Sequence, residues 1–363
     1  MSLKEVWKRG VATLLKPSWE SRVGAAALRW DELGFKYVQT NGAAKASYED
    51  DRWSEIRFDE EPTITMHVAA TALHYGQTCF EGLKAFATTD GGVKLFRPDA
   101  NADRMRRSAE RLMMPTLPEE LFVDACKIAT KNNVEFVPPH GTGGALYLRP
   151  LLLGTSPRIG VAPSSEAAFL VIATPVGDYY KGAFKPVTAK VVDNYDRAAP
   201  RGLGSVKTAA NYAADMLPSL TNKKLGFDIS LYLDPKENKY IEEFGTSNFA
   251  MIKGDTFITP KSNSILASIT NDSVQKIAPS LGLKVERRPI HIDELDEADE
   301  VAAIGTAVVL TPVTKLMYKD RIIQIGDKPE QPGPIFSEIY CRMRAIQTGD
   351  LADEHCWMAD VCE

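Results

Sequence analysis

The chain has 363 residues, 44% hydrophobic and 25% charged, which is ordinary for a globular protein long enough to form two domains. Its formal net charge of -5 gives no reason to expect nucleic acid or an anionic membrane as a partner. The five cysteines are widely spread, and the close pair Cys356 and Cys362 lacks metal-ligand spacing, which predicts free thiols and no metal site. No segment has the length and apolar character of a membrane span or a signal peptide, so we expect a soluble, cytoplasmic protein.

The first half of the chain is predicted to mix strands and helices after an irregular segment that covers residues 1 to about 60. Gly91-Gly92 predicts a hairpin turn. Arg97-Pro98-Asp99 predicts the start of a helix, because the carboxylate of Asp99 favours the positive end of the helix dipole. A second helix is expected from Pro118 to about Asn133, and the strongest strand patterns cover 145–153 and 168–174.

The second half continues the alternation after a connection rich in small, aromatic and turn-forming residues. Strands are expected at 187–194, 229–233, 239–243, 248–252, 283–288 and 300–304, and helices at about 208–224, 265–281 and 335–347. We therefore predict an α/β fold of the α+β type with two domains. A smaller N-terminal domain would cover 1–176, an interdomain loop 177–186 and a larger C-terminal domain 187–363.

Lys207 stands out because its surroundings are unusual for a lysine. It follows a turn with glycines at 202 and 204 and precedes an alanine-rich run that predicts the start of a helix. Its neighbours are small and none within four residues is acidic, so a flat ligand could approach the backbone. Such a lysine is partly desolvated, and desolvation lowers its pKa toward the amine that attacks carbonyl groups. The alternative interpretation is a surface lysine at a helix start.

Three later segments carry groups that could serve a ligand held at that lysine. Glu242 and Glu243 end a predicted strand before a turn, and strand alternation directs their side chains to opposite faces. Ser268–Asp272 lies in or just before a predicted helix, and Gly305-Thr306-Ala307 forms a loop of small residues. Helix N-termini and turns of small residues present backbone N–H groups to phosphate.

In this order, the motifs resemble those of the fold type IV pyridoxal-phosphate enzymes, and most closely the branched-chain amino acid aminotransferases. The resemblance covers roughly residues 60 to 325. The matching motifs are Phe80–Phe86, Leu95–Pro98 with Asp103-Arg104-Met105, Leu146–Pro150, Lys207-x-x-x-Asn211-Tyr212, Glu243–Asn248 and Gly305–Ala307. It implies a two-domain fold type IV enzyme with pyridoxal 5'-phosphate, held mainly by the larger C-terminal domain. The implied reaction moves the amino group of leucine, isoleucine or valine reversibly to 2-oxoglutarate, giving the 2-oxo acid and glutamate.

The resemblance also assigns residues that hold the cofactor. Lys207 would bind the aldehyde covalently and would then move a proton as general base and acid. Glu243 would pair with the ring nitrogen and keep it protonated, which makes the ring a better electron acceptor. Tyr212 would hydrogen-bond the phenolic oxygen. The phosphate would be held by Arg104, Ile269, Thr270 and Thr306.

The implied substrate pocket is apolar and draws on two copies of the chain, so a homodimer is expected. Its residues would be Phe80, Tyr147, Tyr179, Thr246 and Ala307, with Tyr75, Ile159 and Val161 from the partner subunit. Arg149 and Tyr147 would bind the second carboxylate of glutamate. Some relatives carry a Cys-x-x-Cys pair after Gly-Thr-Ala, whereas Val308–Thr311 follows here, so a thiol switch is not expected at this position.

Two alternatives remain at this point. A D-amino acid aminotransferase or an aminodeoxychorismate lyase of the same fold would keep the lysine, the acid and the phosphate loop, because those residues serve the cofactor. The long N-terminal region and the Tyr147/Arg149 pair favour the branched-chain enzyme. A non-catalytic binding module with this fold is the other alternative. The presence together of Lys207, Tyr212 and Glu243 with Arg104 argues against it.

Overall fold

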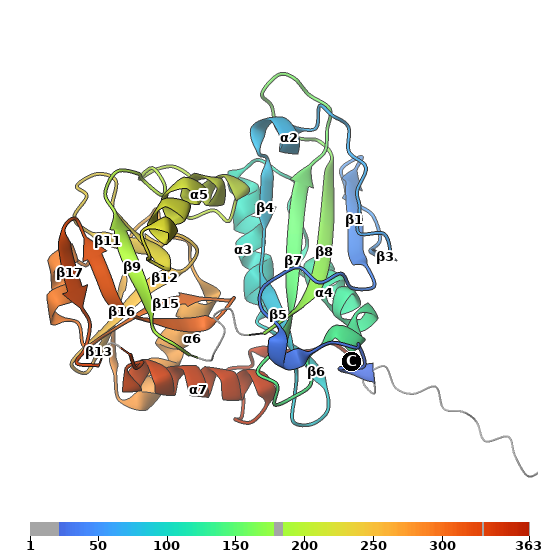
Figure 1. The fold of residues 1–363 in the computed structure, drawn as a ribbon. Coiled ribbons are helices and arrows are strands. Elements are labelled where there is room, and N and C mark those ends of the chain that lie inside the picture. The colour runs from blue at the N-terminus through green and yellow to red at the C-terminus, as the bar shows by residue number, and fades with distance from the viewer. Residues whose placement is uncertain (1–21, 178–183, 329, 363) are drawn as a thin grey trace, which may run out of the picture.

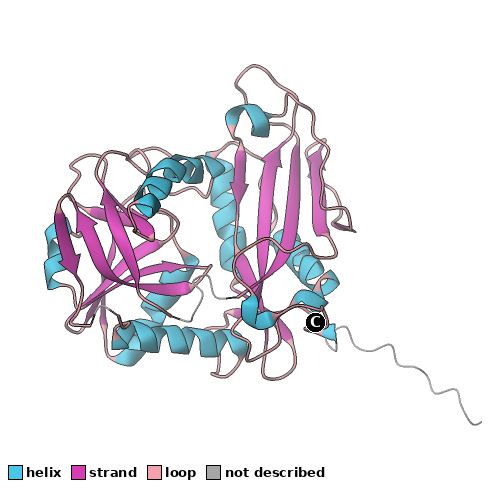
Figure 2. Ribbon diagram, viewed as in Figure 1, coloured by secondary structure: helices cyan, strands magenta, loops and turns pink. Residues whose placement is uncertain are grey.

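The computed structural model describes residues 22–177, 184–328 and 330–362, which fold into two β-sheets that lie side by side with helices around and between them (Figure 1). Nine strands form each sheet. The mixed α/β composition is plain when the elements are coloured by type (Figure 2). This arrangement confirms the α/β prediction.

The first sheet has the strand order β18-β6-β5-β7-β8-β1-β2, with β3 beside β1 and β4 beside β7. Its longest strands, β7 and β8, pair along their whole length, and both contribute buried aliphatic residues to the core. The strands are β1 (Ala43–Glu49), β2 (Arg52–Trp53), β3 (Arg57–Asp59), β4 (Thr78–Phe80), β5 (Leu83–Ala87), β6 (Val93–Phe96), β7 (Ala145–Gly154), β8 (Ala167–Val176) and β18 (Met358–Asp360).

Helices α3 (Pro98–Arg111) and α4 (Glu119–Asn132) pack on this sheet. Met105 and Ala109 of α3 and Phe122 of α4 enter the core at helical spacing. Shorter helical segments are η2 (Trp30–Glu32), α2 (Thr71–Tyr75) and η3 (Val134–Phe136). Helix α3 begins where expected, and α4 lies close to its expected bounds.

The second sheet has the order β11-β10-β9-β16-β15-β12-β13-β14, and β17 pairs with β16. Because β11 also pairs with β12, the strands from β11 to β12 close into a small barrel. The strands are β9 (Val187–Val192), β10 (Ile229–Leu233), β11 (Ile241–Phe244), β12 (Asn248–Lys253), β13 (Thr256–Pro260), β14 (Lys284–Arg288), β15 (Glu300–Gly305), β16 (Val309–Tyr318) and β17 (Arg321–Gln324).

Three longer helices accompany the second sheet: α5 (Ala209–Lys224), α6 (Ile269–Ile277) and α7 (Pro334–Thr348), with η4 (Ala278–Leu281) and η5 (Ile292–Glu297). In Figure 1, α5 lies along the upper side of the molecule and α7 along its base. Helix α7 contacts β15 and β16 as well as β5, so it connects both sheets. The carboxylate of Glu300 accepts the backbone N–H groups of Ile335 and Phe336 and thereby caps α7.

The expected elements of the second half are present, but the start of α6 differs and further strands occur. Helix α6 begins at Ile269 and not near Ile265, because the Ser268 hydroxyl caps it there. Strands β13, β16 and β17 were not predicted, and β16 begins directly after the small-residue loop. The last strand, β18, lies at the end of the chain and pairs with β6 in the first sheet. Strand pairing over such a sequence distance leaves no local pattern.

Within residues 22–177, 184–328 and 330–362, none of the helices is long and apolar enough to span a bilayer. The same residues bring together no group of His, Cys, Asp and Glu side chains able to hold a metal ion.

Candidate active site

Lys207 is held where the two sheets meet. The backbone N–H of Phe80 donates to the Lys207 carbonyl at 3.0 Å, and the Thr208 hydroxyl donates to the Thr78 carbonyl at 2.8 Å. The Lys207 N–H donates to the hydroxyl of Ser108 on α3 at 3.2 Å. The segment before α5 therefore extends the edge of β4, and the lysine is anchored by the first sheet although it belongs to the second half of the chain.

The amine of Lys207 is half-buried and lies among aromatic rings. Its Nζ donates to the Tyr212 hydroxyl at 2.8 Å and lies 4.8 Å from the centre of the Phe80 ring. Desolvation by burial, followed by the nearby positive charge of Arg104, lowers the pKa of Lys207 to about 8. Burial raises the pKa of Tyr212 to about 12, so this residue stays a neutral phenol. The site thus holds a weakly basic amine near neutral pH.

Asn211 fixes the turn that precedes this lysine. Its side-chain amide donates to the carbonyls of Leu203 and Val206 at 2.7 and 2.8 Å. A Cβ at Gly204 would overlap the carbonyl of Ser264, so only glycine lets this turn approach the loop before α6. The glycine turn noted in the sequence is therefore a place of close approach between two loops.

Phe80, Tyr147 and Arg149 form one wall beside the amine. The Arg149 guanidinium lies 4.8 Å from the Phe80 ring centre and 5.3 Å from that of Tyr147, and it donates to the Tyr147 hydroxyl at 3.0 Å. A Cβ at Gly82 would overlap that hydroxyl, so Gly82 leaves room for it. Phe35, which the sequence analysis missed, packs edge-on against Tyr147. The wall is aromatic and carries one cation.

Glu243 lies at the end of β11 in a buried ion pair. Its Oε1 is 2.7 Å from Nη1 of Arg197, and both side chains are almost fully buried. It also accepts the Leu266 N–H and the Asn248 side-chain amide, both at 3.0 Å. Burial raises the pKa of Glu243 to about 7, although Arg197 and these donors act in the opposite direction. Arg197 was not predicted, since nothing in its own segment marks it as a partner for Glu243.

Glu242 has a different set of partners, as strand alternation predicts. It accepts the hydroxyls of Ser262 and Ser264 and is buried. These serines belong to the loop that leads into α6. The two adjacent acids therefore lie in separate environments: Glu243 is paired with an arginine, and Glu242 accepts hydrogen bonds from hydroxyl groups.

The residues expected at the phosphate come together from three elements. Ile269 and Thr270 form the first turn of α6, and they line one hollow with Thr306 of the β15–β16 loop. The Ser268 hydroxyl accepts the Asn271 N–H, while the N–H groups of Ile269 and Thr270 have no acceptor within the helix. Such a helix N-terminus attracts anions through its dipole and its N–H groups.

Arg104 extends from α3 toward this region and is paired with Glu81, a partner that was not predicted from the sequence. Its Nε and Nη2 donate to the two oxygens of Glu81 at 2.7 and 2.6 Å, and its Nη1 donates to the Ala267 carbonyl at 3.0 Å. Glu81 is completely buried and also accepts the Asn101 amide. The only hint in the sequence was an acid placed between Phe80 and Gly82. Arg104 is thus pre-oriented, and it keeps N–H groups for another acceptor because a guanidinium has five.

Thr246 and Ala307 lie on two neighbouring turns. The turn after β11 brings Thr246 and Ser247 close to Gly305, and Thr246 is exposed. The carbonyl of Ala307 accepts Nζ of the buried Lys84 at 2.7 Å, which ties this loop to β5. Lys84 was not predicted, because a lysine in a short apolar strand has no special spacing.

The three residues assigned to a partner subunit lie elsewhere. Tyr75 donates its hydroxyl to the Ile159 carbonyl, and Val161 is near them in sequence on the β7–β8 connection. All three are exposed at the end of the first sheet near α2 (Figure 1). Among the described residues, none of their hydrogen bonds or ring contacts reaches the Lys207 cluster. Tyr179 lies outside the described residues.

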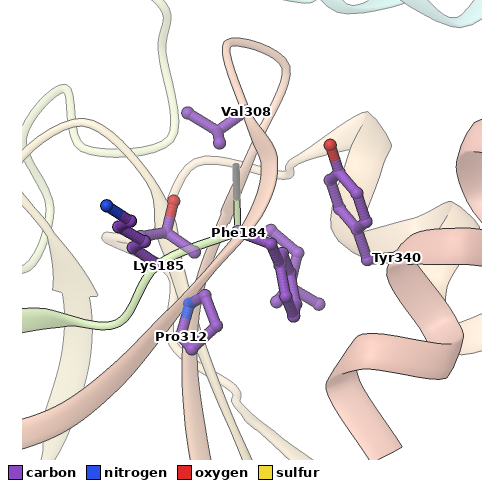
Figure 3. Close-up of a pocket in the computed structure, with 7 residues that line it drawn as sticks. Phe184, Lys185, Val308, Pro312 and Tyr340 are labelled. Atoms are coloured by element: carbon purple, nitrogen blue, oxygen red, sulfur yellow. The ribbon is translucent and has the colours of Figure 1, made fainter. Parts of the chain in front are cut away.

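Val308 and Thr311 face a second hollow on the other side of the β15–β16 loop. Figure 3 shows Val308 and Pro312 around it with Phe184, Lys185 and Tyr340. Val308 and Thr311 are the two positions at which some relatives were expected to carry cysteines. Here both side chains lack a thiol, and Val309 between them has a φ of 70°, a strained conformation for a β-branched residue.

The donor set fits pyridoxal 5'-phosphate on chemical grounds. The half-buried amine has a lowered pKa, the buried carboxylate is supported by arginine, the phenol remains neutral, and the helix N-terminus lies next to an arginine. Each matches one functional group of this cofactor: its aldehyde, ring nitrogen, phenolic oxygen and phosphate.

Comparison with known proteins gives a consistent result. Residues 78–316 match the family described as amino-transferase class IV. The chain is 43% identical over 341 residues to the branched-chain-amino-acid aminotransferase of Haemophilus influenzae. This match covers 92% of this chain and 99% of the relative. The Escherichia coli branched-chain amino acid aminotransferase has a similar structure, with a TM-score of 0.72, 27% identity, and coverage of 89% of this chain and 99% of the other. The T.th. branched-chain amino acid aminotransferase with pyridoxamine 5'-phosphate matches with a TM-score of 0.74, 26% identity, and coverage of 89% and 100%.

Proposed function

The chain belongs to the class IV aminotransferases, and we propose that it moves the amino group of leucine, isoleucine or valine reversibly to 2-oxoglutarate. The products are the branched-chain 2-oxo acid and L-glutamate. The observation that supports this proposal most directly is the half-buried Lys207 amine, with its lowered pKa, against Tyr212 and Phe80. A lysine in this state reacts with carbonyl groups near neutral pH.

Pyridoxal 5'-phosphate supplies an aldehyde that combines with amines and a ring that accepts the electron pair released at the substrate α-carbon. Lys207 is the residue that binds it covalently. Glu243, supported by Arg197, holds the proton of the ring nitrogen, and Tyr212 donates to the phenolic oxygen. Arg104, Thr306 and the first turn of α6 hold the phosphate.

Lys207 also moves the proton in the reaction. A general base is most effective when its pKa is close to the working pH, and the pKa of this amine is about 8. It would take the proton from the substrate α-carbon as a base and deliver it, as an acid, to the cofactor carbon that carried the aldehyde. Tyr212, with a pKa of about 12, does not compete for that proton and keeps the amine oriented through their 2.8 Å hydrogen bond.

The substrate pocket uses the aromatic wall. Phe80 and Tyr147 offer apolar surface for a branched side chain. Arg149, whose guanidinium lies against both rings, binds the second carboxylate when glutamate is the substrate. Thr246 and Ala307, on the two adjacent turns, contact the substrate's own carboxylate.

The relatives named above favour this reaction over the alternatives of the same fold. A D-amino acid aminotransferase or an aminodeoxychorismate lyase would share the cofactor residues, and a binding module would have no need of a reactive lysine. The test is an amino-donor panel with the purified protein, pyridoxal 5'-phosphate and 2-oxoglutarate. Leucine, isoleucine and valine should each yield glutamate, whereas D-alanine should not. The proposal would be overturned if D-alanine were the only active donor, or if none of the tested amino acids yielded glutamate.

A homodimer is the proposed working unit, and helix α5 supplies the supporting observation. Its buried face is polar, with Asn211, Asp215 and Asn222, whereas Met216, Leu217 and Leu220 are 68, 58 and 54% exposed. This is the reverse of the pattern of a helix on a free surface. Exposed apolar residues that gather on one face favour a protein partner. Tyr75, Ile159 and Val161 are exposed as well, which suits their proposed contribution to the pocket of a second copy.

The cytoplasm is the proposed location. All five cysteines are free thiols, and Cys79 and Cys126 are deeply buried. Free cysteines suit a reducing compartment.

A further inference from the structure

Helix α3 reaches the start of α6 with two arginines. Arg104 donates to the Ala267 carbonyl at 3.0 Å, and Arg97, which precedes the first residue of α3, donates to the Ile269 carbonyl at 3.2 Å. Positions seven residues apart lie on the same side of a helix. The two guanidinium groups therefore hold carbonyls two residues apart on the segment that leads into α6.

Arg97 is fixed on every side. Its Nη1 shares its two N–H groups among the Ile269 carbonyl, the Asp272 carboxylate and the Ser273 hydroxyl, the last two at 2.7 Å. Its guanidinium lies 5.4 Å from the centre of the Trp357 ring, and its backbone N–H donates to the Trp357 carbonyl at 2.7 Å. The φ of Arg97 is 50°, in the left-handed region that residues other than glycine seldom adopt. Such a conformation persists only where the surroundings determine it strongly.

The contact with Ile269 has a consequence for the first turn of α6. The Ile269 carbonyl and the Thr270 N–H belong to one planar trans peptide, so they point in opposite directions. Arg97 holds this carbonyl directly and through the Ser273 hydroxyl, which accepts Arg97 and donates to the carbonyl at 2.9 Å, so these contacts set the direction of the N–H. That N–H has no acceptor within the helix, and Thr270 lines the hollow that Thr306 and Phe96, the neighbour of Arg97, also line.

We propose that Arg97 is a positioning residue for the phosphate of the cofactor. It aligns the N-terminus of α6 with Arg104, so that the two anion-binding groups, which come from different halves of the chain, face one phosphate. This inference rests on the proposed function, since it concerns the same cofactor. Arg97 acts through Ile269 and Asp272, and Lys207 and its surroundings do not depend on it.

The test compares pyridoxal 5'-phosphate with pyridoxal, which has the aldehyde but no phosphate. The cofactor is removed from the purified enzyme, and the dissociation constant of each compound is measured by absorbance titration. In Arg97→Ala the constant for pyridoxal 5'-phosphate should rise about tenfold or more, the size expected from a lost charge-assisted hydrogen-bond arrangement. The constant for pyridoxal should change by less than about twofold, since a difference of that size is only a few tenths of a kcal/mol.

Lys276→Ala is the matched control. It removes the Lys276 amine, which forms the second ion pair of Asp272 with Nζ 3.0 Å from Oδ2. The contacts of Arg97 with Ile269 and Ser273 stay in place. Both compounds should then bind as they do to the wild type. Asp272→Asn is a second variant in case Arg97→Ala does not fold. It removes the charge that holds Arg97, and it should weaken binding of the phosphate compound selectively but less strongly.

Two results would overturn the inference. An equal loss for both compounds would mean that Arg97 only supports the fold, and unchanged binding of pyridoxal 5'-phosphate would mean that α6 is aligned without it. Failure of the proposed function looks different, because the wild type itself would then not bind pyridoxal 5'-phosphate.

Discussion

Nη1 of Arg197 lies 2.7 Å from Oε1 of Glu243, with both side chains almost completely buried. Oε1 also accepts the Leu266 N–H, and Oε2 accepts the Asn248 amide. Each carboxylate oxygen can accept two hydrogen bonds, so Oε2 can still accept one more donor. The proton of a ring nitrogen is a suitable donor, and Arg197 opposes the rise that burial causes in the pKa of this carboxyl group.

Glu243→Gln should reduce turnover with leucine by at least about a hundredfold, because a neutral amide does not hold a proton on the ring nitrogen. Binding of pyridoxal 5'-phosphate should weaken far less, since Arg104 and α6 still hold the phosphate. Glu242→Gln is the control. It should raise the activation free energy of turnover by less than about 1 kcal/mol, because an amide oxygen still accepts hydrogen bonds from hydroxyl groups. Steady-state kinetics of both variants decide the matter. The reverse ranking would assign the ring nitrogen to Glu242.

Arg197→Gln should change the pH dependence of turnover. Burial raises the pKa of Glu243 to about 7, and Arg197 opposes this rise. Without the arginine the pKa moves further up, so the carboxylate is protonated over a wider range of acidic and neutral pH. The loss of turnover should therefore be greatest at low pH and should shrink as the pH rises. A loss of equal size at every pH would indicate a structural defect and would refute this explanation.

The pKa of Lys207 should be visible in the capture of the cofactor. Only the neutral amine attacks the aldehyde, and burial lowers this pKa from 10.5 to about 8. In cofactor-free protein the capture rate should rise with pH up to about 8 and then level off. Stopped-flow absorbance measures the rate, and borohydride treatment with peptide mapping should place the pyridoxyl label on Lys207. A rate that keeps rising toward pH 10.5, or a label on another lysine, would contradict the assignment.

Tyr232→Phe should lower the free energy of unfolding by about 1–3 kcal/mol, because it leaves a buried carboxylate with one donor fewer. That carboxylate belongs to Asp215, which accepts the Tyr232 hydroxyl at 2.6 Å and the Ser219 hydroxyl at 2.8 Å. Tyr240→Phe is the control, since this half-exposed ring packs on His291, and its effect should stay within about 0.5 kcal/mol. Denaturant titration measures both. Equal effects would show that the Asp215 contact contributes little.

Leu217→Glu should convert the protein into an inactive monomer. Each copy would place a carboxylate in an apolar interface, where an unpaired charge is costly. Lys223→Glu, on the same helix and also exposed, is the matched control and should leave the assembly and the activity unchanged. Sedimentation at working concentration distinguishes monomer from dimer. An active monomer would mean that the pocket is complete within one chain and that Tyr75, Ile159 and Val161 do not contribute to it.

Much of the protein is determined by local patterns that the sequence itself carries. The long strands β7 and β8 follow from runs rich in apolar residues, and α3 follows from apolar residues at helical spacing. Lys207 and Glu243 could be singled out for a similar reason. A lysine among small residues and an acid at a strand end are visible within a few positions of the chain, and their order along the chain matched a known family.

The tertiary structure decided which residues meet. Glu81 with Arg104, Arg197 with Glu243, and Arg97 with the first turn of α6 each join positions far apart in the chain. The pairing of β18 with β6 is of the same kind. A buried charge needs a partner, but its own segment does not say which one, because the free energy of the pair depends on a contact made only after both halves have folded. For this reason the reactive groups can be predicted from the sequence, whereas only the fold identifies the residues that shift their pKa values and orient them.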